Sequence, residues 1–395
     1  MISADTSPSA SKLGSRDVLA VACGAHALHD GFTDLLYVLL PIWQTAFGLD
    51  YASVGFLRAL ASGTLAAMQV PASWSARRVG GSAVLAAGTA LVGIAYLMAG
   101  ASGGLVSLGL ALGLAGLGLS TQHPIASSLV AQAYEGSGSR IALGIYNFAG
   151  DIGKMSIPAA MAFLVMFLTW RPAVSIIGLI GLAAAALIAI RLRSLNRVIE
   201  HARERPIPSS SPVKRGFGLL LAIGIIDSAT RMAFLTFLPF VLRSKGGDVA
   251  SIGIALTLVF AGGAAGKFVC GFLGARLGVL NTVYVTEGLT AAGILALLPL
   301  PLAGTFVLLP LIGIALNGTS SVLYGTVPEL VPADRREHGF GVFYTGTIGA
   351  GALSPIIYGL FANALGVFVM MGLIAAVVLA TIPLAIRLRP ALSRT

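Results

Sequence analysis

Four ionisable side chains lie inside the apolar stretch CGAHALHDGFTDLLYVLLPIW near the N-terminus: His26, His29, Asp30 and Asp34. An ionisable group at the centre of a bilayer costs about 2.5 to 3.5 kcal/mol on insertion scales, so stability does not explain four of them in one span. On a helix, Thr33 and Tyr37 join His26 and the two acids at three- and four-residue spacing, which makes one polar stripe. Such a stripe can bind a polar ligand, exchange protons or hold a metal ion. We therefore interpret it as the wall of a wet cavity.

The composition indicates an integral membrane protein. The chain is 56% hydrophobic and only 10% charged, whereas a soluble domain is about one quarter charged. Cys23 and Cys270 lie in separate apolar runs, which predicts small packing residues and neither a disulfide nor a metal cluster. The net charge of +10 is spread over short connections, so it favours a topology signal over a nucleic-acid surface.

A membrane helix needs about 20 apolar residues. Breaking the chain at glycine, proline and charge clusters gives twelve such runs, at 18–43, 52–75, 82–100, 104–133, 141–168, 173–190, 217–242, 250–273, 279–300, 304–328, 339–361 and 366–386. Most basic residues fall in connections on the N-terminal side of the membrane, and only Arg171, Arg243 and Lys245 fall in connections on the other side. Basic loops stay in the cytoplasm, so both termini are expected there.

The one long polar connection divides the chain into two halves, and we expect five segments. They are a cytoplasmic tail at 1–17 without the apolar core of a signal peptide, a six-helix bundle at 18–190, a cytoplasmic loop at 191–216, a second six-helix bundle at 217–386 and a tail at 387–395.

The second half repeats the first at a nearly constant offset. Asp30 recurs as Asp227 and Thr33 as Thr230, 197 residues later. The same offset, or 198, relates further pairs: Pro41 to Pro239, Arg78 to Arg276, Gly80 to Gly278, Gly116 to Gly313, Gly144 to Gly341 and Pro158 to Pro355. The sequence thus predicts an all-α membrane protein whose twelve transmembrane helices form two pseudo-symmetric six-helix bundles.

The repeat and one loop motif resemble the major facilitator superfamily of transporters. The segment GFLGARLG is similar to the family's G-x-L-a-D-R-x-G motif, with Gly271, Arg276 and Gly278 in place and Ala275 at the acidic position. Its first-half copy, SWSARRVGG, has Arg77, Arg78 and Gly80 and also lacks the acid. In the family that acid helps to hold the cytoplasmic side closed, so this chain is expected to close in another way.

Within the superfamily, two elements resemble the fosmidomycin-resistance group of exporters. They are H-x-x-[NH]-D in the first span, at His26, His29 and Asp30, and H-P-x-A-S in the fourth, beginning at His123. The resemblance implies a drug-resistance efflux protein of the bacterial inner membrane, which works by alternating access and leaves the substrate open; we expect a proton-coupled antiporter. The expected spans hold both buried acids and buried basic residues, so a small polar or anionic organic compound is the expected cargo. No cofactor, enzymatic activity or nucleic-acid partner is expected, and we expect a monomer.

In this interpretation Asp30 carries the coupled proton, His29 or His26 passes it to the cytoplasm, and Asp227 is the second candidate carrier. In the superfamily spans 1, 4, 7 and 10 line the central path. The side chains expected to face the substrate are Asp34, Tyr37, Gln122, His123, Asn147, Asp151, Lys154, Arg231, Lys267, Asn317, Tyr324 and Tyr344.

Several of these residues also have a structural interpretation. Asp34 pairs with Arg231 across the pseudo-two-fold axis, or binds substrate. His26 is an interfacial histidine, or a proton relay. His123 hydrogen-bonds a carbonyl freed by Pro124, or lines the cavity. Asp151 and Lys154, three residues apart, neutralise each other or contact substrate. Arg58 and Glu287 lie nearer span ends and are expected to be structural or to snorkel.

Two other functions remain open from the residues. The histidines and acids of the first span are competent ligands for a divalent metal ion, which makes metal or metal-chelate export the alternative. The basic residues of other spans, including Arg231, oppose that alternative, and the cluster has no Cys or Met for a soft metal. A membrane enzyme is disfavoured because H-E-x-x-H, G-x-S-x-G and Walker motifs are absent from the sequence. The missing Walker loop leaves an ion gradient or facilitated diffusion as the energy source.

Overall fold

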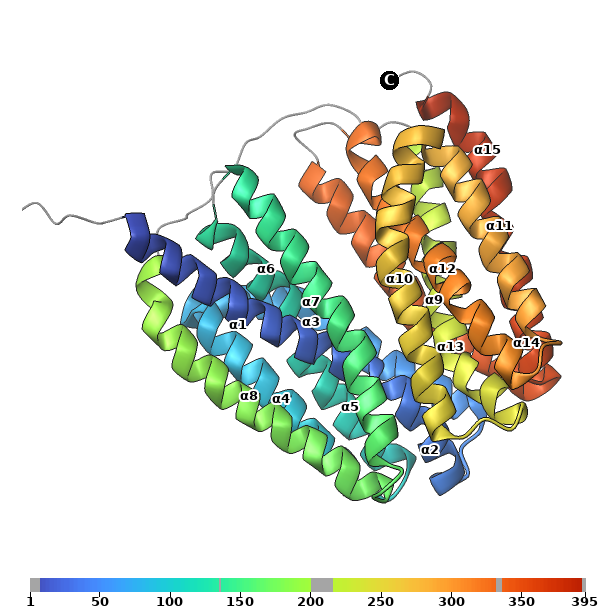
Figure 1. Ribbon diagram of the computed structural model, residues 1–395, viewed down its shortest axis with the longest axis horizontal. Coiled ribbons are helices and arrows are strands. Elements are labelled where there is room, and N and C mark those ends of the chain that lie inside the picture. The colour runs from blue at the N-terminus through green and yellow to red at the C-terminus, as the bar shows by residue number, and fades with distance from the viewer. Residues whose placement is uncertain (1–7, 135, 200–215, 332–335, 393–395) are drawn as a thin grey trace, which may run out of the picture. The chain divides into compact units, whose positions relative to one another are not determined.

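The computed structural model describes residues 8–134, 136–199, 216–331 and 336–392. Fifteen α-helices are found in this part of the chain (Figure 1): α1 Pro8–Asp34, α2 Leu36–Phe47, α3 Tyr51–Val79, α4 Gly81–Gly100, α5 Leu105–Leu119, α6 Gln122–Ala133, α7 Gly136–Leu164, α8 Trp170–Ile199, α9 Gly216–Ser244, α10 Val249–Leu277, α11 Val279–Leu297, α12 Leu302–Leu330, α13 Arg336–Leu365, α14 Val367–Val378 and α15 Thr381–Leu392. Three expected spans are each built from two helices, α1 with α2, α5 with α6, and α14 with α15. The fifteen helices therefore give the twelve spans expected from the sequence.

The three interruptions are short and keep the backbone hydrogen-bonded. Leu35 N donates to Gly31 O at 2.8 Å across the junction of α1 and α2. Thr121 N donates to Gly118 O at 3.3 Å, and Ala380 N donates to Val377 O at 3.0 Å. Because a bilayer offers no water to unpaired amides, these bonds make the breaks tolerable inside a span.

Three of the expected spans are less apolar than the others, and each holds ionisable residues inside it. Among the described residues, nine helical stretches are long and apolar enough to cross a membrane, and they leave out α1 with α2, α3 and α7. These are the segments with the Asp30 stripe, with Arg58, and with Asp151 and Lys154. In the first half, the expected site residues of α1 and α7 thus lie in spans of low hydropathy.

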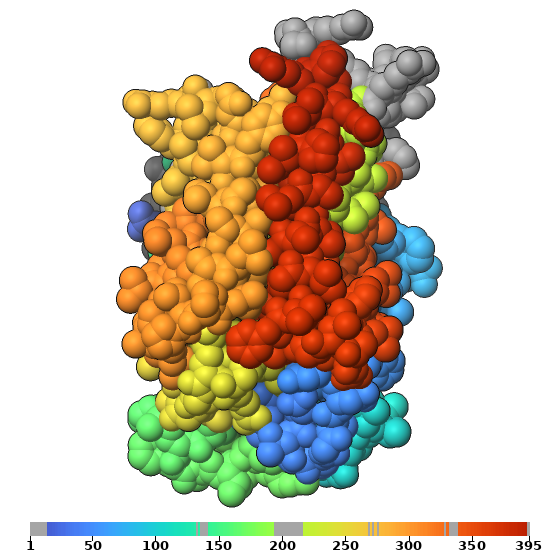
Figure 2. All heavy atoms as spheres, turned by 90° about the vertical axis from the view of Figure 1, so that its right-hand side faces the viewer, coloured from blue at the N-terminus to red at the C-terminus, as the bar shows by residue number. Residues whose placement is uncertain are grey.

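The chain divides into two compact units, unit 1 at Met1–Leu35 and Thr64–Arg205, and unit 2 at Leu36–Gly63 and Pro206–Thr395. In unit 1, α1 packs on α7, and α4 packs on both α5 and α8. In unit 2, α9 packs on α13, and α10 packs on α12. Figure 2 shows a face of unit 2 on which α14 and α15, in red, run beside α11, in orange.

Glycines permit the closest of these contacts. A Cβ at Gly153 of α7 would collide with the backbone of Ala27 in α1, and one at Gly262 of α10 would collide with Pro310 of α12. Small residues let membrane helices approach closely where no hydrophobic effect drives them together.

The two halves repeat in local structure as well as in sequence. Gly80, between α3 and α4, and Gly278, between α10 and α11, have φ angles of 93° and 79°, a region that only glycine enters freely. Asp50 Oδ1 accepts from Ser53 N and Asp248 Oδ1 from Ser251 N, both at 2.8 Å. These caps begin α3 and α10, and the offset of 198 that relates the two glycines also relates Asp50 to Asp248.

Four helix ends lie in segments expected as tails or as the central loop, among them the start of α9 at Gly216 and the end of α15 at Leu392. α1 begins at Pro8, within the segment expected as an N-terminal tail. α8 continues to Ile199, within the segment expected as the central loop. Most of that loop, at 200–215, lies outside the described residues.

Candidate functional site

Asp30 is the centre of a polar cluster in unit 1. Its Oδ2 lies 3.2 Å from Lys154 Nζ on α7 and 3.3 Å from His26 Nε2, one turn earlier on α1. Its Oδ1 lies 3.6 Å from His123 Nε2 on α6. The structure therefore brings together four of the residues that the sequence singled out, from three helices.

The tautomer of His26 is set by the backbone of α7. His26 Nδ1 lies 2.8 Å from the carbonyl oxygen of Tyr146, and since a carbonyl only accepts, Nδ1 must donate a proton. The rings of His26 and Tyr146 also stack, with centroids 4.1 Å apart. A neutral His26 thus presents a bare Nε2 to Asp30. The contact is attractive only when a proton sits on Nε2 or on the carboxyl group. The two side chains can therefore hold one proton between them.

Glycines of α7 make room for the cluster. A Cβ at Gly150 would lie 2.8 Å from Asp30 Oδ2 and from His26 Nε2, too close for either polar atom. Gly153, beside Ala27, lets α7 press against α1 at this level. Lys154, the next residue, is then within reach of Asp30.

One side of the cluster is accessible. The side chain of His123 is 49% exposed and that of Lys154 is 32% exposed, whereas that of Asp30 is 10% exposed. Behind it, Gln122 Nε2 donates to the Tyr146 hydroxyl at 3.3 Å, and Gln122 is buried. The lysine and the histidine of the cluster are therefore more accessible than the acid.

His29 lies apart from the cluster. Its Nε2 is 2.8 Å from Thr89 Oγ1 on α4, and the Thr89 hydroxyl donates to Leu85 O at 2.8 Å. Because the threonine proton is used there, His29 Nε2–H must be the donor to Thr89. Of the other expected residues in unit 1, Asp34 and Asp151 are buried and Asn147 is exposed.

The expected site residues of unit 2 fall into separate groups. Tyr37, in α2, accepts a hydrogen bond from Arg58 Nη2 at 2.9 Å, and its ring lies under the guanidinium. Arg231 Nη1 donates to Ser320 Oγ at 3.0 Å, and Asp227, one turn before Arg231, is buried. The pairing of Arg231 with Asp34 stays a prediction.

The remaining residues of unit 2 lie on α10, α12 and α13. Asn317 Nδ2 donates to Gly313 O at 3.2 Å. The rings of Tyr324 and Tyr344 meet edge to face, with centroids 4.9 Å apart. Lys267 is exposed.

The loop-motif residues lie at helix ends in both halves. Arg77 and Arg78 are exposed at the end of α3, and Arg276 is exposed near the end of α10, stacked on Phe272 at 4.3 Å. Gly271 lies within α10.

Of the two interpretations of Arg58 and Glu287, structural or snorkelling, the structure excludes snorkelling and corrects their expected place near span ends. Arg58 is 2% exposed and Glu287 is 1% exposed, so neither side chain reaches a membrane surface. Arg58 lies well inside α3, which begins at Tyr51, and Glu287 lies in the middle of α11. Sequence reasoning also missed Tyr146 and Thr89, which have no charge to attract attention.

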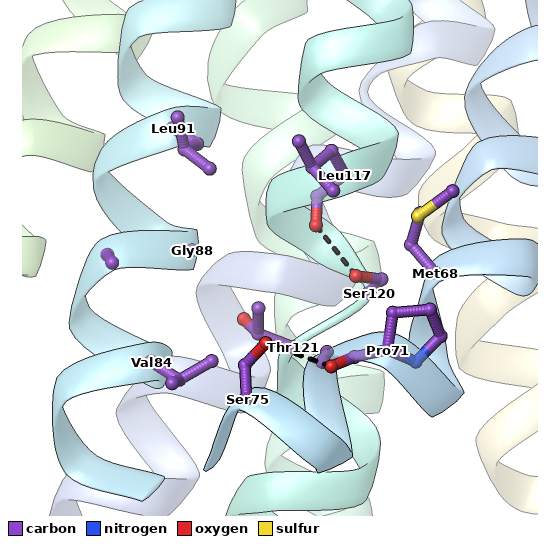
Figure 3. Close-up of a pocket in the computed structure, with 11 residues that line it drawn as sticks. Met68, Pro71, Ser75, Val84, Gly88, Leu91, Leu117, Ser120 and Thr121 are labelled. Atoms are coloured by element: carbon purple, nitrogen blue, oxygen red, sulfur yellow. Dashed lines mark hydrogen bonds between the residues drawn. The ribbon is translucent and has the colours of Figure 1, made fainter. Parts of the chain in front are cut away.

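A pocket elsewhere in unit 1 is unsuited to a polar ligand. It is formed by α3, α4 and α5, and Figure 3 shows Met68, Val84, Leu91 and Leu117 around it. Its hydroxyl groups bond to their own helices, Ser75 to Pro71 O at 3.0 Å and Ser120 to Leu117 O at 2.7 Å. Accessible charged or titratable side chains lie instead beside Asp30, at His123 and Lys154.

Two repeated six-helix halves with a buried acid cluster define a multi-pass membrane protein of the secondary-transporter class. The family model of the Major Facilitator Superfamily matches residues 22–222 and 219–395. The chain belongs to this superfamily and is a membrane transporter.

Known relatives agree with that assignment. The chain is 22% identical over 351 residues to a probable sulfoacetate transporter, SauU, of Cupriavidus necator, covering 82% of this chain and 81% of the relative. It has the fold of a bacterial homologue of the human lysosomal transporter Spinster, solved in an inward-facing and unoccupied conformation, at 16% identity, 96% coverage of both chains and a TM-score of 0.75. It also has the fold of the nucleoside transporter NupG, solved as a point mutant, at 14% identity, 95% and 99% coverage and a TM-score of 0.77. The superfamily is thus confirmed, while the resemblance to the fosmidomycin-resistance group has no specific support among these relatives.

Proposed function

We propose that this transporter moves a small organic anion in exchange for protons, by alternating access, and that the Asp30 cluster of unit 1 binds both. The observation that carries the proposal is the composition of the cluster. One carboxylate faces a lysine and two histidines at 3.2 to 3.6 Å, so the site holds more basic groups than acidic ones. An anion is the ligand that such a site favours.

Substrate and proton compete for the same charges. An anion that takes Lys154 away from Asp30 leaves the carboxylate beside the two histidines, His26 and His123, in a mostly buried place. Losing a cationic partner raises the proton affinity of an acid, so anion binding and proton uptake are linked. The printed name of the relative from Cupriavidus necator, a probable sulfoacetate transporter, supports an organic anion as the class of substrate.

The direction that we propose is export, with the protein in a bacterial inner membrane and both termini in the cytoplasm. These points follow from the resemblance and from the distribution of basic residues described above. Everted membrane vesicles with an imposed pH gradient test them, because export by proton exchange appears there as uptake driven by an acidic interior.

The substrate experiment uses a panel of sulfonates, dicarboxylates and one organic cation, with sulfoacetate as the first probe. Lys154→Gln should abolish anion transport, and Asp30→Asn should abolish gradient-driven transport while it preserves counterflow of labelled anion. Ser156→Ala is a matched control, because Ser156 is exposed on α7 and donates to Ile152 O of its own helix. Full gradient-driven transport by Asp30→Asn would refute the proposed coupling site.

Metal-ion export is a second candidate with one observation in its favour. His26, Asp30 and His123 offer ligand atoms that lie within 4.8 Å of one another. Lys154 argues against metal binding, because its ammonium group lies 3.2 Å from Asp30 Oδ2 and would repel a cation there. Calorimetry with Zn²⁺ and Mn²⁺ separates the two functions: tight binding that is lost in His123→Ala would favour the metal.

A further inference from the structure

Two acids of unit 2 lie against each other in the protein interior. Asp227 on α9 is 4% exposed and Glu287 on α11 is 1% exposed. Their carboxyl groups lie close enough to interact with each other. Two ionised carboxylates in contact repel each other, and a proton on one of them turns the contact into a hydrogen bond.

The surroundings supply too little positive charge for two carboxylates. Arg231 is the nearest cation, and its Nη1 donates to Ser320 on α12 at 3.0 Å. Within the described residues, neither acid forms an ion pair. Two ionised acids beside one arginine would leave a buried negative charge, which is costly in a low-dielectric interior.

The other elements around the pair offer hydroxyl groups and apolar atoms. Thr319 of α12 donates to Thr286 of α11 at 2.7 Å, and α13 presents Gly351 beside Ser228 of α9. α14 has no titratable side chain, and those of α15 are Arg387 and Arg389. Glu287 Oε1 is buried with no hydrogen-bond partner in the described structure, which a neutral acid tolerates better than a carboxylate.

The repeat explains why the two halves differ here. Lys154 plus the offset of 197 gives Gly351, and Thr89 plus the offset of 198 gives Glu287. Unit 1 therefore sets a lysine against its acid, whereas unit 2 has a glycine in place of the lysine and a second acid in place of the threonine. Unit 2 therefore has no counterpart of the lysine that lies beside the acid in unit 1.

We propose that Asp227 and Glu287 form a second proton-binding site, in which the two carboxyl groups share one proton that Arg231 can displace. Arg231 is one helical turn from Asp227, so a guanidinium that turns from Ser320 to the pair supplies the missing positive charge. The proton then leaves to water, and both acids are ionised. The role of this proton in transport rests on the proposed function, whereas its binding does not.

Infrared spectroscopy of the purified transporter in lipid at neutral pH tests the binding. The C=O stretching band of a protonated carboxyl group should be present in the wild type and lost in Glu287→Gln and in the double variant Asp227→Asn/Glu287→Gln. It should remain in Asp30→Asn, and in Glu329→Gln, a matched control at an exposed acid of α12. The substituted Asn and Gln side chains have nearly the shape of the acids that they replace. Unchanged melting temperatures would show that the variants are folded.

Two results would overturn the proposal: no such band in the wild type, or a full band in the double variant. Disappearance of the wild-type band on addition of Na⁺ would also overturn it, because the pair would then be a sodium site. Counterflow should persist in Glu287→Gln while gradient-driven transport falls at least tenfold. Failure of the Asp30 site alone would appear as normal gradient-driven transport in Asp30→Asn, with the infrared result unaffected.

Discussion

His26 and His29 show how two identical side chains three residues apart come to do different things. His26 has its Nδ1 fixed by the Tyr146 carbonyl and its Nε2 turned toward Asp30. His29 donates to Thr89, on another helix. Of these two histidines, only His26 has a ring nitrogen that faces Asp30. We therefore propose proton relay for His26 and a structural role for His29.

Thr89→Val should test the role of His29. The substitution keeps the shape but removes the acceptor of a buried N–H group, which costs about 1 to 3 kcal/mol of stability. We expect a lower melting temperature and normal gradient-driven transport per folded protein. His26→Gln is the contrasting variant, and it should lose gradient-driven transport.

Loss of transport in Thr89→Val at an unchanged melting temperature would contradict this assignment. It would place His29 and Thr89 in the proton path. The two readouts, a thermal-shift assay and vesicle transport, are made on the same preparation.

The centre of the site could be predicted at this scale, but its partners could not. Asp30 can be identified from the sequence because an acid deep in an apolar run is costly and does not stabilise a membrane helix. Its contact with Lys154 joins residues far apart in sequence, and Asp151, one turn before the lysine, offers an obvious local partner instead. The burial of Glu287 was missed because distance from a loop is a poor measure of depth when helix ends are uncertain by a few residues.

At the scale of the element, helix starts repeat between the halves and can be tested separately from transport. Asp248 caps α10 by accepting from Ser251 N at 2.8 Å and from Ser251 Oγ at 2.6 Å. These hydrogen bonds hold the pKa of Asp248 below its ordinary value of 3.8, and the bond from the Ser251 hydroxyl has the larger effect. The stabilisation is therefore complete above that value, and it is lost as the pH falls through the lowered pKa.

Asp248→Ala should lower stability by about 1 kcal/mol at neutral pH. Asp248→Asn should keep most of the stability, because asparagine also caps helices, and should remove the acid-dependent part. Thermal unfolding in detergent between neutral and acidic pH measures both effects. An Asp248→Asn protein with the same acid sensitivity as the wild type would show that other groups are responsible.

A second element-scale prediction concerns the ends of α2 and α3 that meet near residue 50. Arg243 Nη1, at the end of α9, donates to Pro41 O at 2.6 Å and to Thr45 Oγ1 at 2.7 Å. Asn363, on α13, donates to Asp50 Oδ2 and accepts from Tyr51 N, both at 2.8 Å. Both contacts lie within unit 2, which contains residues 36–63 of the first half and the whole second half. They therefore connect α2 and α3 to helices of the second half.

Arg243→Gln and Asn363→Ala should each release this corner, and the double variant should release it further. We expect faster amide hydrogen exchange at residues 44–53 and unchanged exchange in α4 and α8 of unit 1. Ser244→Ala is a matched control, because Ser244 donates to Val241 O of its own helix. Equal protection of residues 44–53 in all variants would show that packing alone holds the corner.

Most elements could be predicted because their signals are local. The loop glycines at 80 and 278 and the long apolar runs mark where helices stop and start. The interruption at Leu35 has no such signal, since Leu35 is an ordinary helix former with Gly31 and Pro41 at some distance. It arises where the chain passes from unit 1 to unit 2, which is a property of tertiary packing.

At the scale of the whole molecule, the repeat gives two copies of one helical arrangement and lets their chemistry diverge. Unit 1 neutralises its acid with Lys154, and in the proposal above unit 2 neutralises its acids with a proton. An anion would act on the first site by taking the lysine, and Arg231 would act on the second by replacing the proton. Two ion sites of different kinds in one repeat fold give a transporter two separate points at which charge can be exchanged.

The distribution of basic residues predicts the membrane topology of the chain. Arg and Lys residues gather in the loops that share a side with the termini, and such loops stay in the cytoplasm. We expect single cysteines at Ser210, in the central connection, and at Gly103, between α4 and α5, to be labelled from opposite sides. Gly103 is exposed, and a Cβ there would meet no atom within 4 Å, so the substitution causes no strain. Gly246 serves less well because its φ of 85° disfavours a cysteine.

The background carries Cys23→Ala and Cys270→Ala, and a membrane-impermeant maleimide is applied to intact cells and to everted vesicles. Ser210→Cys should react only in the vesicles and Gly103→Cys only in the cells. Reaction of both from the same side would mean that the number of spans between them is even, and the twelve-span topology would be wrong.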